Sequence, residues 1–243
     1  MKYPVLGVNI DHVATLRQAR GEVYPNVIEA AKICEKSDIY CITAHLREDR
    51  RHIQDADIYA LKEAVSTRLN MEMSLADDIV QIACDVRPYM ATLVPERREE
   101  ITTEGGLDII SHRDRLASVI ERLRQKDIVV SLFIEPDPSL LDTAVDLGAE
   151  YVEFHTGAYA SAGSEDQRQA ELDRLYHASR EAVARSLFVN AGHGLTLDNV
   201  APVLKMHQLR ELNIGHSIVS RALFVGLQNA VEEMLTQINT VRI

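Results

Sequence analysis

The chain has 243 residues, with 26 lysines and arginines against 37 aspartates and glutamates, so its formal net charge is −11. This length suits one large domain or two small ones, a hydrophobic share of 46% argues against a disordered chain, and the acidic balance argues against nucleic acid as a partner. The longest stretch without a charged residue, Ser186–Leu197, has 12 residues, whereas a membrane helix needs about 20, so no membrane association is expected.

Eight short segments, rich in β-branched residues and bounded by turn residues, are predicted to be strands. They recur along the whole chain at intervals long enough for a helix between each pair. In chain order the predicted strands are Val5–Ile10, Tyr40–His45, Arg68–Met73, Tyr89–Pro95, Ile128–Pro136, Tyr151–Gly157, Leu187–Gly192 and Glu211–Gly215.

The segments between these strands carry apolar residues at helical spacing. Asp55 is the expected N-cap of one helix, and Gly148 is the expected left-handed residue after another. The predicted helices are Asn26–Lys36, Ala56–Val65, Asp77–Val86, Asp114–Arg124, Leu140–Leu147, Glu165–Arg185, a short piece after Asp198, and about Ser217 to Ile238.

Strands that alternate with helices through short links predict a single (β/α)8 TIM barrel with a parallel eight-stranded core, formed by residues 1–243 as one domain. A doubly wound open sheet has a similar repeat count and is the alternative fold. One long loop, residues 96–108, departs from the repeat and contains Gly105 and Gly106. Because long glycine-bearing loops after barrel strands often close over active sites, this segment is a candidate lid.

Polar and apolar residues alternate in several of the predicted strands, so that each strand has one polar face. Helices cover the outside of a barrel, so the polar face is expected to point into the lumen, near the strand ends where barrel active sites lie. Burying an unpaired polar group costs about 1–3 kcal/mol, which a fold tolerates where such groups meet a ligand. The polar set contains Asn9, Asp11, Cys41, Thr43, His45, Asn70, Glu72, Glu153, His155 and Asn213.

Histidines repeat this pattern, because five of the nine fall at or just past the ends of five different strands. These five are His12, His45, His155, His193 and His216, and His52 lies in the loop after the second strand. One such histidine is usually structural, but a convergent set of titratable groups indicates a functional site. The remaining three, His112, His177 and His207, are expected at the surface.

Glycine and arginine residues indicate a site for phosphate. Gly192-His193-Gly194 follows the seventh strand and Gly215-His216-Ser217 the eighth, where barrels commonly bind phosphate at a helix N-terminus. Five arginines in the loops after the first two strands suggest a local funnel for an anionic substrate on an otherwise acidic protein. They are Arg17, Arg20, Arg47, Arg50 and Arg51.

Glu72 is the strongest candidate for a general base, because it lies between Met71 and Met73 and desolvation would raise its pKa toward neutral pH. A buried structural glutamate is the alternative. The sequence offers no His-x-His pair, and the remaining histidine and carboxylate spacing is too generic to predict a catalytic metal.

Eight motifs, spread in order along the chain, resemble the pyridoxine 5′-phosphate synthase family. Their order and number make the resemblance far more specific than any single fingerprint. The motifs are Gly7–Arg17, Ile42–Ile53, Asn70–Met73, Leu93–Glu96, Thr102–Asp108, Glu153–Gly157, Asn190–Leu195 and Glu211–His216.

This resemblance implies a barrel enzyme of vitamin B6 biosynthesis, a transferase-type ring-closing condensation without cofactor or metal. It would join two phosphorylated small molecules, 1-deoxy-D-xylulose 5-phosphate and 3-amino-2-oxopropyl phosphate, to give pyridoxine 5′-phosphate, phosphate and water. The resemblance also implies a homo-octamer built from dimers. Three cysteines without a CxxC pair, Cys34, Cys41 and Cys84, agree with a reducing compartment, and the absence of a secretory segment favours the cytoplasm.

Site roles follow from the resemblance, position by position. His45 and Glu72 would be proton acceptors, His193 a proton donor or shuttle, and Glu153 the group that stabilises charge in the transition state. The amino-ketone phosphate would be held by Asn9, Arg20, Gly194, Gly215 and His216. The deoxyxylulose phosphate would be held by Asp11, His12, Arg47, His52 and Thr102.

Two other functions stay open from the residues alone. A metal-assisted TIM-barrel hydrolase would carry stoichiometric zinc. A non-enzymatic phosphometabolite-binding barrel would lack a complete set of acids and bases, whereas this chain keeps one.

Overall fold

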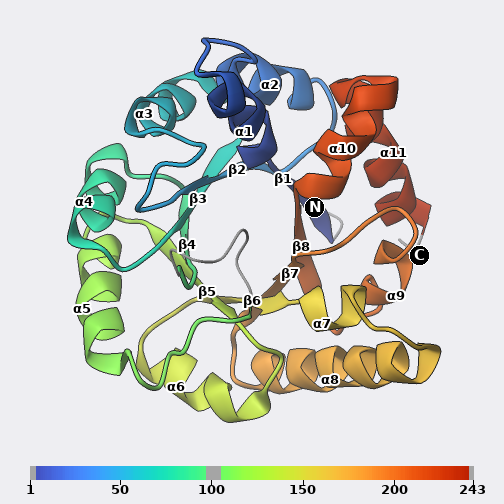
Figure 1. Cartoon of the computed structure of the whole chain (residues 1–243). Coiled ribbons are helices and arrows are strands. Elements are labelled where there is room, and N and C mark those ends of the chain that lie inside the picture. The colour runs from blue at the N-terminus through green and yellow to red at the C-terminus, as the bar shows by residue number, and fades with distance from the viewer. Residues whose placement is uncertain (1–3, 97–104, 241–243) are drawn as a thin grey trace.

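The computed structural model describes residues 4–96 and 105–240. In this part of the chain eight parallel strands pair in sequence order, and β8 pairs with β1 to close a barrel (Figure 1). The strands are β1 Val5–Asn9, β2 Cys41–Leu46, β3 Arg68–Met73, β4 Met90–Leu93, β5 Val129–Ile134, β6 Tyr151–His155, β7 Phe188–Gly192 and β8 Leu209–Ile214. The predicted (β/α)8 barrel is confirmed, and every predicted strand is present with ends that agree within two residues.

Helices form a ring around the strands (Figure 1). Their bounds are α1 Asp11–Arg20, α2 Val27–Cys34, α3 Asp55–Ala64, α4 Asp77–Val86, α5 Arg113–Arg124, the 3-10 turn η1 Pro138–Leu140, α6 Leu141–Asp146, α7 Gly157–Ala160, α8 Glu165–Ala184, α9 Val200–Val203, α10 His216–Val225 and α11 Leu227–Thr240. Every predicted helix is present, and the prediction for α4 matches its observed ends.

Three details differ from the sequence prediction. Residues 11–20, expected as a loop, form α1, which ends at Gly21 in the left-handed region at φ 63°. The predicted final helix is two helices, because Gly226 at φ 85° separates α10 from α11. Asp55 is the first residue of α3, and the N-cap is Gln54 instead. The Gln54 backbone N–H donates to the Asp57 carboxylate at 2.8 Å.

The two faces of the strands separate as expected. Apolar side chains such as Ile42, Met71 and Phe154 are fully buried in the hydrophobic core, whereas polar residues of the opposite parity are buried toward the lumen. The buried lumen residues are Cys41, Thr43, Asn70, Thr92, Ser131, Glu153, Asn190, Glu211 and Asn213.

Asn213 on β8 joins several of these polar groups in the lumen. Its amide donates to Glu153 Oε2 at 2.6 Å, and its carbonyl oxygen accepts from the Thr43 hydroxyl at 2.9 Å. The Cys41 thiol donates to Glu211 Oε1 at 3.2 Å on the same side of the barrel. Gly7 leaves room for this network, because a Cβ atom at that position would lie 2.3 Å from Asn213 Oδ1. Most of the polar lumen is therefore paired, which offsets the desolvation of its groups.

Within the described ranges, no helix combines the length and apolar character needed to cross a bilayer. The thiols of Cys34, Cys41 and Cys84 are all buried and free of disulfide bonds.

Candidate active site

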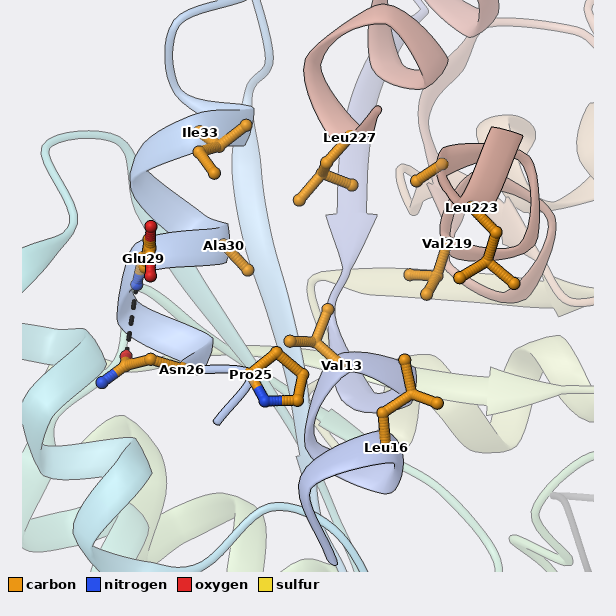
Figure 2. A pocket seen from close by; sticks show the side chains of 11 residues that line it. Val13, Leu16, Pro25, Asn26, Glu29, Ala30, Ile33, Val219, Leu223 and Leu227 are labelled. Atoms are coloured by element: carbon orange, nitrogen blue, oxygen red, sulfur yellow. Dashed lines mark hydrogen bonds between the residues drawn. The ribbon is translucent and has the colours of Figure 1, made fainter. Parts of the chain in front are cut away.

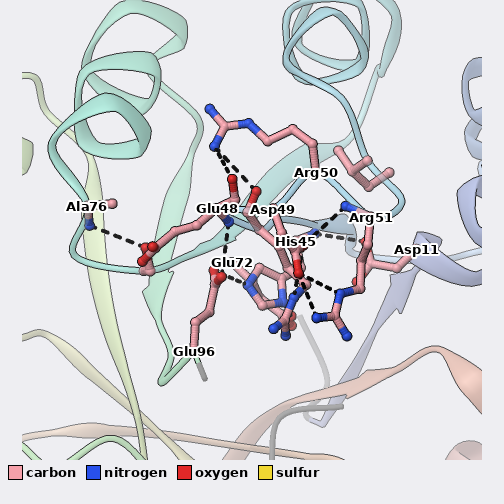
Figure 3. Close-up of polar contacts among 12 residues, drawn as sticks. Asp11, His45, Glu48, Asp49, Arg50, Arg51, Glu72, Ala76 and Glu96 are labelled. Atoms are coloured by element: carbon pink, nitrogen blue, oxygen red, sulfur yellow. Dashed lines mark hydrogen bonds and ion pairs between the residues drawn. The ribbon is translucent and has the colours of Figure 1, made fainter. Parts of the chain in front are cut away.

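Side chains at the carboxyl ends of the strands converge on two groups of contacts. The first, here called the acid–base cluster, consists of Asp11, His45, Glu72 and Glu96 (Figure 3). It is built at the ends of β1, β2, β3 and β4, which are neighbours in the barrel. Barrel enzymes place their chemistry at this end of the strands.

His45 lies at the centre of the acid–base cluster, with a side chain that is 5% exposed. Its Nε2 lies 2.9 Å from Glu96 Oε1, and its Nδ1 lies 3.8 Å from Glu72 Oε2. Asp11 fixes the backbone at this point, because its Oδ1 accepts the His45 N–H at 2.8 Å. One imidazole is thus placed between two carboxyl groups.

Opposite pKa shifts distinguish these two carboxyl groups. Burial raises the pKa of Glu72 well above its ordinary value, and the nearby charges of Asp11 and Glu153 raise it further. Burial also acts to raise the pKa of Glu96, but the hydrogen bond and charge of His45 outweigh it and hold that pKa below the usual value. Two titratable groups whose environments separate their pKa values are suited to act as an acid and a base.

The same cluster offers three atoms of the kind that bind metals. One ligand atom from each of Asp11, His45 and Glu72 lies within 4.8 Å of the other two. Both oxygens of Asp11 already accept hydrogen bonds, from the His45 N–H and from Asn9 Nδ2 at 2.8 Å. Coordination of a cation would therefore compete with hydrogen bonds that shape the site.

The second group of contacts, here called the anion site, is formed by the loop after β7 and the N-terminus of α10. His193 and Gly194 both adopt left-handed backbone angles, at φ 82° and φ 75°. The Ser217 hydroxyl donates to the Leu195 carbonyl at 2.6 Å and so ties the two segments together. First-turn N–H groups of a helix have no intrahelical acceptor and, with the helix dipole, attract anions.

Imidazole rings surround the anion site, and the pKa of two of them is lowered. Burial lowers the pKa of His193 to about 4, with further lowering from His155 and His216. Burial also lowers the pKa of His12, whose Nε2 lies 3.2 Å from Nδ1 of His216. The rings of His193 and His12 are therefore neutral at pH 7, and a nearby negative charge would favour their protonation.

Glu153 lies in the lumen between the acid–base cluster and the anion site. Burial and the nearby Glu211 raise the pKa of Glu153 to about 8. Gly192 on β7 makes room for this side chain, because a Cβ atom there would lie 2.4 Å from Glu153 Oε1. Glu153 thus has the properties of a buried carboxyl group that is protonated near neutral pH.

The arginines differ from the expected funnel. Arg17 pairs with Asp57 at 2.7 Å, and Arg50 pairs with Asp55 and Asp78, both at 2.8 Å. These two cations are therefore already neutralised by neighbouring carboxylates. Arg47 is 3% exposed beside Asp49, with Nε 3.6 Å from Oδ1, and it belongs to the buried wall of the site.

Of the remaining predicted site residues, some lie beside the acid–base cluster or the anion site and one lies apart from both. The ring of His52 is 6.1 Å from that of His45, and Gly215 precedes α10 beside Asn9, whose Oδ1 would lie 2.9 Å from a Cβ there. Arg20 ends α1 in an exposed position and, within the described residues, makes no hydrogen bond or ion pair with the others. Thr102, and residues 97–104 of the candidate lid, lie outside the described residues.

Three side chains that contact these groups are missing from the sequence prediction of the site. Glu96 contacts His45, and Glu135 contacts His155, which in turn lies beside His193. Glu135 follows directly on β5 and Glu96 lies three residues past the end of β4, so the rule that singled out the histidines would also have found them. His155 was noted among the strand-end histidines but was given no role.

A closed parallel barrel with acidic and basic side chains at its strand ends has the architecture of a (β/α)8 enzyme. A family model described as "Pyridoxal phosphate biosynthesis protein PdxJ" matches residues 6–240. The chain belongs to this family.

Named relatives support the same family. A pyridoxine 5'-phosphate synthase of Synechococcus sp. (strain JA-2-3B'a(2-13)) is 56% identical over 229 residues, which cover 94% of this chain and 96% of the relative. The protein of that name from Thioalkalivibrio sulfidiphilus (strain HL-EbGR7) is 50% identical over 237 residues, or 98% of this chain and 96% of the relative.

Solved structures share the fold at low sequence identity. Phosphoribosyl anthranilate isomerase from Thermus thermophilus aligns over 98% of this chain and 100% of its own, with a TM-score of 0.62 and 13% identity. KGPDC from Streptococcus mutans aligns over 98% of both chains, with a TM-score of 0.67 and 8% identity. At such identities the likeness concerns the barrel alone.

Proposed function

We propose that this chain is a pyridoxine 5′-phosphate synthase that condenses 1-deoxy-D-xylulose 5-phosphate with 3-amino-2-oxopropyl phosphate. The products are pyridoxine 5′-phosphate, inorganic phosphate and water. The observation that carries the proposal is the pairing of His45 with two carboxyl groups of opposite pKa shift, beside a separate anion site. Family membership and the names of the relatives agree with it.

The chemistry of such a condensation matches the groups at the strand ends. Joining an amine to a ketone expels water, and the later enolisation and phosphate elimination each require a proton to move. Glu72 and His45 accept protons in this scheme, Glu153 stabilises charge in the lumen, and His193 donates or relays a proton at the anion site. A neutral His193 becomes a donor after a dianion has raised its pKa.

Two phosphate groups require two seats. Asn9, Arg20, Gly194, Gly215 and His216 hold the amino-ketone phosphate in this proposal, where the N-terminus of α10 supplies N–H donors. The deoxyxylulose phosphate is assigned to Asp11, His12, Arg47, His52 and Thr102. Two described parts of residues 96–108 contact side chains at the strand ends, since Glu96 bonds His45 and the Gly106 N–H donates to Glu135 at 2.9 Å. These contacts support the role of a lid for the segment.

The direct test is to incubate the purified chain with both phosphorylated substrates and to follow the fluorescent pyridinol product. We expect product only when both substrates are present, together with one equivalent of released phosphate. Phosphate release from either substrate alone would contradict the proposed condensation.

Phosphate binding is expected to be coupled to proton uptake. Because burial holds the pKa of His193 near 4, this ring is neutral when the anion site is empty, and a dianion beside it would raise that pKa. The complex would then bind more protons than the free protein, so affinity should fall as pH rises through the new pKa. Calorimetric titration of inorganic phosphate at pH 7, in buffers of different ionisation enthalpy, measures this directly. Heats that do not depend on the buffer would contradict the prediction.

A metal-assisted hydrolase is the second candidate, because Asp11, His45 and Glu72 offer ligand atoms within 4.8 Å of one another. Metal analysis of protein purified without a metal-affinity tag separates the two functions. We expect no stoichiometric zinc and unchanged condensation activity after dialysis against a chelator. Stoichiometric zinc with loss of activity on chelation would favour the hydrolase.

We also propose that the chain forms a homo-octamer built from dimers, and that an apolar groove between α1, α2, α10 and α11 is one contact between copies. The groove has a volume of about 330 Å³ and is lined by residues such as Val13, Ile33 and Leu227 (Figure 2). Leu223, which also lines the groove, and its chain neighbour Phe224 are 71% and 83% exposed. A groove and a projecting apolar pair on the same face suit a two-fold contact, in which each copy receives the other's side chains.

Replacing Phe224 by aspartate is expected to shift the protein to a smaller assembly, because a carboxylate would be buried without a partner in the contact. Sedimentation velocity gives the assembly mass. Ile110→Asp is the matched control, since Ile110 is a 55% exposed apolar residue of another face. An unchanged mass for the Phe224 variant would remove this face from the assembly.

The phosphorylated substrates do not cross membranes unaided, so we place the enzyme in the cytoplasm.

A further inference from the structure

His155 ends β6 and is 8% exposed, with a ring held by a carboxylate from the neighbouring strand. Its Nδ1 lies 2.8 Å from Oε1 of Glu135, the residue that follows β5. The hydrogen bond with His155 lowers the pKa of Glu135 against the effect of burial, so this carboxylate is ionised at neutral pH. An ionised carboxylate only accepts hydrogen bonds, so Nδ1 of His155 carries a proton and donates it to the hydrogen bond with Glu135.

The Nε2 atom of His155 is buried and, among the described residues, has no hydrogen-bond partner. It faces Gly157 at the start of α7, where a Cβ atom would lie 2.3 Å from Nε2 and 3.2 Å from Cδ2 of His193. The two imidazole rings meet at this space, with centroids 5.0 Å apart and planes inclined by 58°. An unpaired buried polar atom costs about 1–3 kcal/mol, which indicates a role beyond packing.

Glu135 also binds the backbone of residues 96–108 near the C-terminal end of that segment. The Gly106 N–H donates to the same Oε1 at 2.9 Å, and the Leu107 N–H donates to the Phe133 carbonyl at 2.7 Å. A Cβ atom at position 106 would lie 2.3 Å from the Glu135 nitrogen, so only glycine allows this approach. One carboxylate therefore contacts both the end of the candidate lid and the histidine beside His193.

We propose that Glu135 and His155 are positioning residues for His193. Glu135 fixes His155 in its Nδ1–H tautomer, and the ring of His155 in turn fixes the ring of His193 at the anion site. The inference rests on the proposed function, in which His193 moves a proton during the condensation. Outer-shell partners that orient metal-bound imidazoles are worth about 10–100-fold in activity, and we expect a similar factor for this metal-free pair.

Kinetics of Glu135→Ala, His155→Asn and the double variant test the pair. Each single change is expected to lower kcat about 10–100-fold with KM within about two-fold, because the ring of His193 is misplaced while its phosphate seat remains. The double variant should lose no more than the larger single loss, since the two residues act as one unit. Glu135→Gln, whose amide oxygen still accepts from Nδ1, should recover much of the rate.

Glu35→Ala is the matched control. Its carboxylate also accepts backbone N–H groups, from Ser66 and Thr67, both at 2.7 Å, but it contacts no imidazole. We expect this variant to lower the melting temperature and to leave kcat unchanged. Losses of kcat that simply multiply in the double variant, or an unchanged kcat in Glu135→Ala, would overturn the proposal.

Nitrogen NMR of protein labelled with 15N-histidine supplies a readout that does not depend on turnover. The ring of His155 should carry a proton on Nδ1 in the unaltered protein, and it should lose this preference in Glu135→Ala. An Nε2–H tautomer in the unaltered protein would refute the pairing. If that protein makes no product from the two substrates, the proposed function fails and the NMR result still stands. If it is active and the variants match it, only the present inference fails.

Discussion

Replacing Glu72 by glutamine is expected to lower kcat by about 10²–10⁴-fold while the fold and the binding of inorganic phosphate persist. Glutamine keeps the shape of the side chain but neither gains nor loses a proton, and general acid–base catalysis is typically worth this factor. Steady-state rates with both substrates and a phosphate titration measure the two properties separately. Glu63→Gln removes an exposed carboxylate from α3 and serves as the control.

Stability should move in the opposite direction in the same variant. The pKa of Glu72 is higher in the folded chain than in the unfolded chain, so its contribution to stability is greatest below the unfolded pKa and declines as pH rises through the folded pKa. Glutamine removes this decline. The melting temperature of the variant should therefore exceed that of the unaltered protein at alkaline pH and approach it at acid pH. A carboxylate with a purely structural role would give a lower melting temperature and an unchanged kcat.

Replacing His45 by glutamine is the second change with a large expected effect, again about 10²–10⁴-fold in kcat. The imidazole contacts both Glu72 and Glu96, so the substitution separates two carboxyl groups that share one ring. Without His45, the pKa of Glu96 should rise, because the hydrogen bond that lowers it is lost.

The pH dependence of kcat measures the loss of rate, and carbon NMR of the Glu96 carboxyl group measures the change in its pKa. His177→Gln changes an exposed histidine of α8 and is the control for the loss of an imidazole. An unchanged rate at every pH in the His45 variant would remove this residue from the mechanism.

Periodicity in the sequence was sufficient for the barrel, because alternation along each strand reflects which side faces the helices. The inward position of Glu153 and Asn213, for example, follows from Val152 and Leu212 on the opposite face. Helix α1 escaped prediction since it begins immediately after β1, with few apolar residues to mark one face.

Contacts between distant segments could not be predicted in this way. That Arg17 and Arg50 are neutralised by carboxylates of α3 and α4 depends on how the helices pack around the barrel. The same holds for the bond between Glu135 and His155, which joins residues on two strands through side chains alone. Residue type and strand position identified the candidates, and only the fold assigned their partners.

The two side-chain hydrogen bonds that Asn213 makes, with Thr43 and with Glu153, also constrain how the barrel assembles during folding. If the register of β8 shifted by one residue, Asn213 and Glu211 would face the apolar layer between the strands and the helices. Glu153 would then lose its amide donor. A barrel with this shifted register would thus carry the desolvation cost of at least three buried polar groups without hydrogen-bond partners. The side chains that equip the molecule for proton transfer therefore also penalise slipped topologies, which an all-aliphatic interior would tolerate.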